Sequence, residues 1–299
     1  MHAIWQTVAT SAQRLSTARP AYAAAALALY VVSLFLAGAR WRGFLRALGA
    51  DAGVTRATLA TLGGIAAGNL TPSPGGEACR VALLRAGGRT TWQQATVAAI
   101  WDRLSELPPI VVLGAMATIA VKSLAAGWRA DTVLAGAIVV LALVGIGVWR
   151  LRRSGGTWTG WRERLSQQRV SRRVFAEGVA YSSLLWLQDF LRLTCVTLAF
   201  GVVLSPTRIA ALSIVAMLGG LVPGIAGLGP VEGGLVAALS AFGVGLPDAA
   251  AITALERIIS YGFSTAAGAV VIALLGGGSL WRAARRRYAP ESDGDAARS

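Results

Sequence analysis

Long apolar stretches, broken at two places by prolines and glycines, constrain this sequence more than any other feature. A membrane-spanning helix needs about 20 mainly apolar residues. Such stretches lie at residues 21–39, 132–148 and in the later part of 174–204, and a further one at 265–275 joins the helix before it. Charged residues make up 14% of the chain, against roughly 25% in soluble domains. The sequence therefore predicts an all-α polytopic membrane protein.

The positive charge of the chain is concentrated in a few short segments. The net charge is +14, and the densest basic segment, 150–173, carries eight arginines and one acid, Glu163. In a soluble protein such a run would suggest nucleic acid, but between two apolar spans it is typical of a cytoplasmic loop. We expect anionic lipid headgroups at this loop, and no nucleic acid partner.

The cysteines and the histidine argue against several classes of site. Cys79 and Cys195 form no CxxC motif, and His2 is the only histidine. A disulfide framework, a zinc site and a histidine-based enzyme are therefore disfavoured. We expect no metal and no cofactor.

The first interruption of the apolar pattern is the sequence GNLTPSPGGEACR at residues 68–80. The apolar stretch before it, 57–69, is too short to span a membrane. Non-helical backbone cannot face lipid, so the interruption must be buried in protein or line a wet cavity. We predict a re-entrant hairpin whose second helix can direct its N-terminus at an anion. The backbone residues predicted for this hairpin and a second one are Pro72, Pro74, Gly75, Gly76, Pro223, Gly224, Gly227 and Gly229.

The second half of the chain repeats the order of the first. Each half contains a long span, a short helix, a Pro/Gly/Glu cluster, a second short helix, and a long helix with an acid-arginine pair. The segments are 20–39, 57–69, 72–77, 78–88 and 91–120 in the first half, and 174–204, 207–221, 223–232, 235–245 and 247–276 in the second. The cluster glutamate precedes the paired acid by 25 residues from Glu77 to Asp102 and by 24 from Glu232 to Glu256. We predict a duplication; chance similarity of Gly/Pro-rich stretches is the alternative.

The number of crossings predicts the orientation of the two repeats. Three spans precede the second repeat, so the repeats are expected to be inverted, as in secondary transporters. Arginines after the first span place loop 40–56 in the cytoplasm and the N-terminus outside. The predicted organisation is an N-terminal segment 1–19, one domain 20–278 (repeat one 20–120, linker span 132–149, cytoplasmic basic loop 150–173, repeat two 174–278) and a basic, then disordered, cytoplasmic tail 279–299.

Ionisable residues inside the apolar segments are the candidate functional residues, because charge at membrane depth is costly. We predict that three arginines attract a lipid phosphate: Arg80, Arg103 and Arg257. We predict that six further residues line a polar cavity or couple transport to protons: Asn69, Glu77, Asp102, Glu106, Glu232 and Glu256.

Structural ion pairs are the alternative interpretation of these charges. Glu77 and Arg80 are spaced i,i+3 and could only pin the first hairpin, and Asp189 and Arg192 have the same spacing. Glu232 has no arginine one turn after it. Its partner is therefore expected elsewhere, with Arg103 and Arg257 as the candidates.

These motifs resemble the flippase-like membrane domain typified by the membrane part of lysylphosphatidylglycerol synthase. The matching segments are 69–80, Asp102-Arg103, 223–232 and Glu256-Arg257, and the likeness covers residues 20–278. The resemblance implies a multi-pass protein of a bacterial-type inner membrane that moves a phosphate-bearing lipid between leaflets. No soluble aminoacyl-transferase domain follows here, so the resemblance gives no reason to expect lysyl transfer.

Three function classes follow from the sequence. The first is a lipid transporter, with an anionic membrane lipid as substrate and no enzymatic activity. The second is an intramembrane enzyme acting on a polyprenyl or phospholipid phosphate, with Glu77 or Glu232 as general base. The third is a small-ion or amphiphile permease. The sequence carries no signal for the oligomeric state.

Overall fold

The fold is built from helices throughout the part of the chain that the structure describes. The computed structural model describes residues 13–50, 52–71, 75–88, 90–114, 170–221 and 229–276. No strand occurs within these residues. The first half contributes α2 (Pro20–Ala47), α3 (Val54–Leu70), α4 (Gly75–Arg85) and α5 (Trp92–Leu104). The second half contributes α9 (Arg172–Ala199), α10 (Pro206–Leu221), α11 (Pro230–Ala241), α12 (Leu246–Arg257), the π-helical turn η1 (Ile258–Phe263), α13 (Ser264–Val271) and η2 (Ile272–Gly276). The all-α prediction is thus confirmed for these residues.

Several predicted segments lie wholly or largely outside the described residues. They are Pro72, Pro74, Pro223, Gly224 and Gly227 of the two clusters, the span 132–149, the basic loop 150–173 before residue 170, and the tail 279–299.

Local signals account for where several helices begin. Pro20 occupies the first turn of α2, where its missing N–H costs no hydrogen bond. α5 starts with a capping box, in which the Gln94 N–H donates to Thr91 Oγ1 at 3.2 Å and the Thr91 N–H donates to Gln94 Oε1 at 3.1 Å. The Ser171 hydroxyl caps α9 by accepting from the Val174 N–H. Each of these signals consists of residues at the helix N-terminus itself, so the local sequence is enough to explain where these helices begin.

The first long helix extends further than predicted. The sequence placed a cytoplasmic loop from residue 40, but α2 continues to Ala47. Trp41, Phe44 and Leu45 on this extension are almost completely buried. The arginine that suggested a loop, Arg40, is itself only 4% exposed. The extension is helical because these apolar side chains pack into the interior and the charge of Arg40 is neutralised there.

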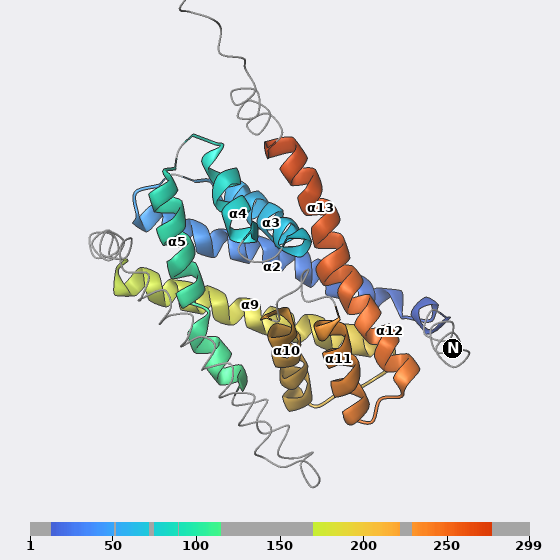
Figure 1. The fold of residues 1–299 in the computed structure, drawn as a ribbon. Helices are drawn as coiled ribbons and strands as arrows, with labels where there is room; N and C mark the ends of the chain where they lie inside the picture. The colour runs from blue at the N-terminus through green and yellow to red at the C-terminus, as the bar shows by residue number, and fades with distance from the viewer. Residues whose placement is uncertain are drawn as a thin grey trace, which may run out of the picture.

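The long helices α2 and α9 lie at the centre of the molecule. Figure 1 shows α2 and α9 side by side, with the α3–α4 pair on the flank of α2 and the α10–α11 pair on the flank of α9. α5 packs on both α2 and α4, and α13 packs on α3. The two halves therefore meet along α2 and α9, and each half adds its own pair of short helices.

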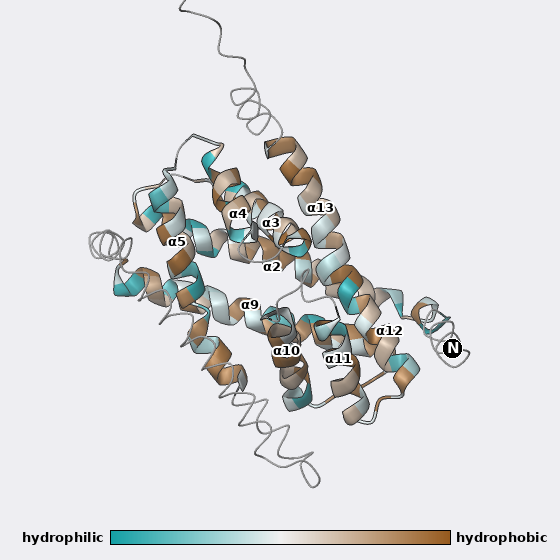
Figure 2. Cartoon of the chain, viewed as in Figure 1, coloured by the Kyte–Doolittle hydropathy of each residue, from teal (hydrophilic) through white to brown (hydrophobic). Residues whose placement is uncertain are grey.

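Two described helical segments are long and apolar enough to cross a membrane. They are Pro20–Ala47 and the continuous helix Leu246–Gly276. Figure 2 shows that hydrophobic residues predominate along the helices and that hydrophilic residues occupy short, separate stretches. Large apolar side chains such as Val32, Phe35 and Val203 are half or more exposed. An apolar outer surface of this extent fits a lipid environment.

Glycines allow α3 and α4 to approach closely at the first interruption. A Cβ atom added at Gly76 would lie 2.7 Å from the carbonyl oxygen of Gly64 and 2.9 Å from Cα of Gly68. Both neighbours are backbone atoms, so neither can move aside without displacing its helix. The close contact of the two short helices therefore requires glycine at position 76.

We expect Gly76→Ala to destabilise the protein by about 1–3 kcal/mol, because the added methyl group overpacks the α3–α4 contact. A thermal melt of the purified protein in detergent measures the change. Gly233→Ala is the matched control, since a Cβ there meets no atom within 4 Å. Equal melting temperatures for the two variants would contradict this account of the packing.

Candidate functional site

A buried aspartate connects three helices in the first half. Asp102 of α5 is completely buried, and its two carboxylate oxygens accept hydrogen bonds from different arginines. Arg40 Nε of α2 donates to Oδ1 at 2.7 Å, and Arg80 Nη1 of α4 donates to Oδ2 at 2.9 Å. The Arg80 guanidinium also lies 3.9 Å from the centre of the Trp41 ring, a favourable cation–π position. Asp102 therefore links α2, α4 and α5.

Arg40 extends this network to α9. Its Nη2 atom lies 2.6 Å from Glu106 Oε1, and its Nη1 atom donates to Ser182 Oγ at 2.8 Å. The Ser182 hydroxyl also lies 3.1 Å from the Ser105 hydroxyl. All three groups of the Arg40 guanidinium thus bind partners, which makes burial of the charge tolerable.

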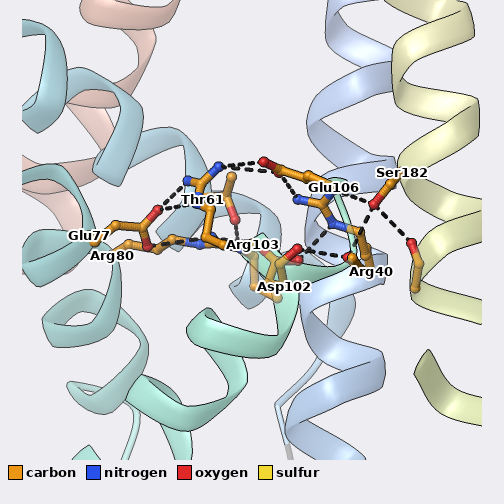
Figure 3. A network of polar contacts seen from close by, with 11 residues as sticks. Arg40, Thr61, Glu77, Arg80, Asp102, Arg103, Glu106 and Ser182 are labelled. Atoms are coloured by element: carbon orange, nitrogen blue, oxygen red, sulfur yellow. Dashed lines mark hydrogen bonds and ion pairs between the residues drawn. The ribbon is translucent and has the colours of Figure 1, made fainter. Parts of the chain in front are cut away.

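Arg103 and Glu77 form the outer end of the same network. Arg103 Nε donates to Glu77 Oε1 at 3.0 Å, and Arg103 Nη1 donates to Glu106 at 3.2 Å (Figure 3). The pin proposed between Glu77 and Arg80 exists only as a 3.6 Å contact, longer than the contact of Arg80 with Asp102. Glu77 and Arg80 therefore each have a closer partner on α5.

The second half contains a similar buried pair between α9 and α12. Arg192 Nη1 of α9 donates to Glu256 Oε1 at 2.9 Å, and both side chains are nearly buried. Arg192 also binds Asp189 one turn earlier, as its i,i+3 spacing suggested. The Tyr30 ring of α2 lies 5.8 Å from the Arg192 guanidinium. Arg192 thus contacts both halves of the molecule.

Glu232 finds its partner in the second half of the chain. Arg257 Nε donates to Glu232 Oε1 at 2.8 Å, so Arg257 is the partner among the two candidates. The other oxygen of Glu232 accepts from the Gly229 N–H at 2.7 Å. Gly229 has a φ of 92°, a left-handed conformation that favours glycine. Glu232 therefore holds the start of α11 and contacts the long C-terminal helix.

The same arrangement of two ion pairs, formed by four residues, occurs in both halves. In each, an arginine on the first long helix binds an acid on a later helix, and the arginine next to that acid binds a glutamate at the start of a short helix. The sets, in the order of these roles, are Arg40, Asp102, Arg103 and Glu77 in the first half, and Arg192, Glu256, Arg257 and Glu232 in the second. Arg80 has no arginine counterpart, because Leu235 stands three residues after Glu232.

Asn69 lies at the contact between α3 and the C-terminal helix. Its Nδ2 atom donates to Ser264 Oγ at 3.1 Å and to Thr265 Oγ1 at 2.8 Å. The Tyr261 hydroxyl donates to the Asn69 carbonyl oxygen at 3.2 Å. Asn69 thus joins the end of the helix before the first interruption to α13 and η1.

An open cavity of about 350 Å³ lies between the two halves, with apolar and charged side chains in its wall; we call it the polar cavity because of the charged groups. Its wall combines Arg40 and Glu106 of the first network with Asp189 and Arg192 of the second. The other lining residues are Tyr30, Ser33, Leu185, Trp186, Gln188, Ser213, Ala216 and Met217. Of the predicted site residues that the structure describes, only Glu106 lines this cavity. The described residues contain no group of three His, Cys, Asp or Glu side chains that could hold a metal ion.

Two polar groups in the cavity wall have no hydrogen-bond partner among the described residues. They are the Gln188 Nε2 atom and the Ser213 hydroxyl. Both side chains are more than nine-tenths buried, at 7% and 2% exposed. A buried polar group without a partner costs free energy. Neither atom is accessible to water in this structure, so each would need a small side-chain movement to reach a ligand in the cavity.

The sequence did not single out most of the cavity residues. Arg40 was interpreted as the flank of a span, and Gln188, Ser213 and Tyr30 carried no motif. A glutamine within a long apolar helix was the signal available for Gln188, since its amide is as costly in lipid as an unpaired backbone group. Ser213 and Tyr30 offered no comparable signal, because serine and tyrosine occur in many membrane helices.

Comparisons with known proteins agree with the resemblance seen in the motifs. A "UPF0104 membrane protein" of Methanothermobacter thermautotrophicus is 28% identical over 296 residues, covering 88% of this chain and 88% of the relative. No solved structure matches the chain significantly. The family model described as the lysylphosphatidylglycerol synthase TM region matches residues 3–268. The chain therefore belongs to the family of membrane proteins defined by the transmembrane region of lysylphosphatidylglycerol synthase.

Proposed function

We propose that this protein is a lipid transporter that moves a phosphate-bearing lipid between the leaflets of the inner membrane, with its basic loop and C-terminus in the cytoplasm. The observation that carries the proposal is the polar cavity between the halves, with Arg40 and Arg192 in its wall. A lipid headgroup cannot cross hydrocarbon without losing its water shell. A cavity lined by arginines, hydroxyls and an amide supplies replacement partners along the path.

Arg40 and Arg192 are the cations best placed to meet a phosphate. Both line the cavity, and both already share their charge with carboxylates. An arriving phosphate would compete with those carboxylates for the guanidinium groups, and bidentate arginine contacts suit phosphate geometry. Paired arginines of this kind bind a headgroup weakly enough to release it again.

The three arginines predicted from the sequence do not line the cavity, so this proposal does not place them in direct contact with the headgroup there. Arg80, Arg103 and Arg257 each bind a carboxylate and lie outside the cavity wall. Arg80 retains two nitrogen atoms, Nε and Nη2, without a hydrogen-bond partner among the described residues. The role of the three arginines as phosphate ligands remains a prediction. For Arg80, the headgroup would have to approach from the side of α4.

The proposal treats the two halves as inverted repeats, each with a re-entrant hairpin. The repeated four-residue arrangement supports a common origin, and the odd number of predicted spans before the second repeat supports inversion. In transporters of this architecture, substrate sites lie near the midplane where the repeats meet. The cavity lies where α2 and α9 meet, as this architecture requires.

Transport by purified protein tests the proposal directly. Proteoliposomes containing fluorescent phosphatidylglycerol are treated with a membrane-impermeant quencher, and the fraction of lipid that becomes accessible over time is measured. We expect Ser213→Ala and Gln188→Met each to slow transport roughly fivefold, because each removes one hydrogen bond, worth about 1 kcal/mol, to the headgroup in passage. Neither variant leaves a protein group newly unpaired, so both should fold.

Thr253→Val is the matched control for Ser213→Ala. The Thr253 hydroxyl is likewise buried and has no partner among the described residues, but it does not line the cavity. Wild-type transport in the control with slow transport in Ser213→Ala supports the cavity as the path. Absence of lipid movement in every sample, together with a hydrolysed or modified lipid product in mass spectrometry, would instead support an intramembrane enzyme.

A further inference from the structure

An apolar groove adjoins the polar cavity at α9, where Trp186 lines both. Its volume is about 280 Å³, and its wall is almost entirely apolar. The groove lies between the helical residues that follow α5 and one face of α9. Its lining residues are Pro109, Val112, Leu113, Ser183, Trp186, Leu187 and Phe190.

The groove and the cavity share one side chain, Trp186. This residue lines both spaces. Two residues further along α9, Gln188 lines the cavity and has an unpartnered Nε2 atom among the described residues. The indole ring of tryptophan has an apolar body and a polar N–H, and it is enriched where apolar and polar environments meet. Trp186 thus lies at the boundary between the apolar groove and the polar cavity.

The groove is open toward the apolar surface of the molecule. Val112 and Leu187 in its wall are 61% and 54% exposed. Leu113 at its base is only 7% exposed. A hydrocarbon chain can therefore enter from the side and lie against a buried floor.

We propose that the groove and the cavity form one amphiphile site, with a hydrocarbon chain of the lipid in the groove and its headgroup in the cavity beyond Trp186. This inference rests on the proposed function and names the site by which the lipid enters. The Gln188 amide and the Ser213 hydroxyl contact the headgroup, and Leu113, Trp186 and Phe190 contact the chain. Lipid tails are as apolar as the groove, so the chain is positioned by van der Waals contacts and not by the hydrophobic effect.

Photolabelling locates the hydrocarbon chain independently of transport. The intact protein is placed in phosphatidylcholine vesicles containing phosphatidylglycerol with a diazirine on one acyl chain, irradiated and digested, and the labelled peptides are identified by mass spectrometry. We expect label on residues 109–113 and 183–190, reduced by excess unlabelled phosphatidylglycerol. Ser183→Phe should reduce this label roughly tenfold, because the ring fills the groove and removes the contacts available to the chain.

Leu184→Phe is the matched control, since Leu184 is the next residue on α9 and is 49% exposed but does not line the groove. It should keep wild-type labelling, and both variants should keep the wild-type melting temperature. Label spread evenly over lipid-facing residues such as Val32 and Phe35, and unchanged in Ser183→Phe, would overturn the groove assignment even if transport proceeds. Labelling of the groove in a protein without transport would support the binding site and reject the transporter proposal.

Discussion

Replacing Asp102 with leucine is expected to lower the stability of the protein by about 3–5 kcal/mol, the usual cost of removing one partner from a buried ion pair. Asp102 is fully buried and accepts from Arg40 and Arg80, which are themselves 4% and 3% exposed. The leucine variant leaves two guanidinium groups facing an apolar side chain. The contacts of Asp102 with Arg40 of α2 and with Arg80 of α4 are lost together, so the cost is not confined to one helix.

The melting temperature in detergent, followed by size-exclusion chromatography of heated samples, measures this effect. A loss of this size corresponds to a fall of roughly 10 °C. Asp102→Leu combined with Arg80→Met should recover part of the loss, because one stranded charge is then removed. The control is Glu177→Ala, which breaks the exposed pair of Arg173 with Glu177 and should leave the melting temperature unchanged. If Asp102→Leu has the same melting temperature as Glu177→Ala, the buried network does not hold these helices together.

The elements of the fold were predictable because their signals are local in sequence. Pro20 and the apolar segment lengths predicted the starts of α2 and α12 to within a residue, but α2 continues to Ala47 and does not end at the predicted residue 39. The acid-arginine pairs also stood out, because charge inside an apolar segment is rare. The partner of Glu232 could be narrowed to two arginines by elimination, and Arg257 is the one that binds it.

A polar cavity was predicted, but most of the residues that line it could not be, because the lining depends on which helix faces meet. Gln188 and Ser213 share a wall only because α9 packs on α2 and α10 packs on α9. No periodicity in one helix encodes such an arrangement. Arg40 shows the same limit: the sequence showed its charge at the end of an apolar stretch, where a solvated flank and a buried ion pair look alike. Only the positions of Asp102 and Glu106 distinguish the two.

Filling the cavity is expected to stop lipid transport while leaving the protein folded. Ala216 of α10 and Ser33 of α2 both line the cavity. A phenylalanine at either position adds a ring to a space of about 350 Å³ and excludes the headgroup. We expect Ala216→Phe and Ser33→Phe each to slow phosphatidylglycerol transport at least roughly tenfold, since the ring also separates the headgroup from the hydrogen bonds and charge-assisted contacts it needs to replace water.

Two positions on different helices are needed because overpacking can destabilise a single variant. Ala237→Phe of α11 is the control, since Ala237 is exposed and does not line the cavity. All three proteins are first compared by thermal melting, and only those within a few degrees of wild type enter the proteoliposome assay. Slow transport in the cavity variants and normal transport in Ala237→Phe assign the lipid path to the space between α2, α9 and α10. Normal transport in both folded variants, Ala216→Phe and Ser33→Phe, would contradict that path, because each ring narrows the cavity from a different helix.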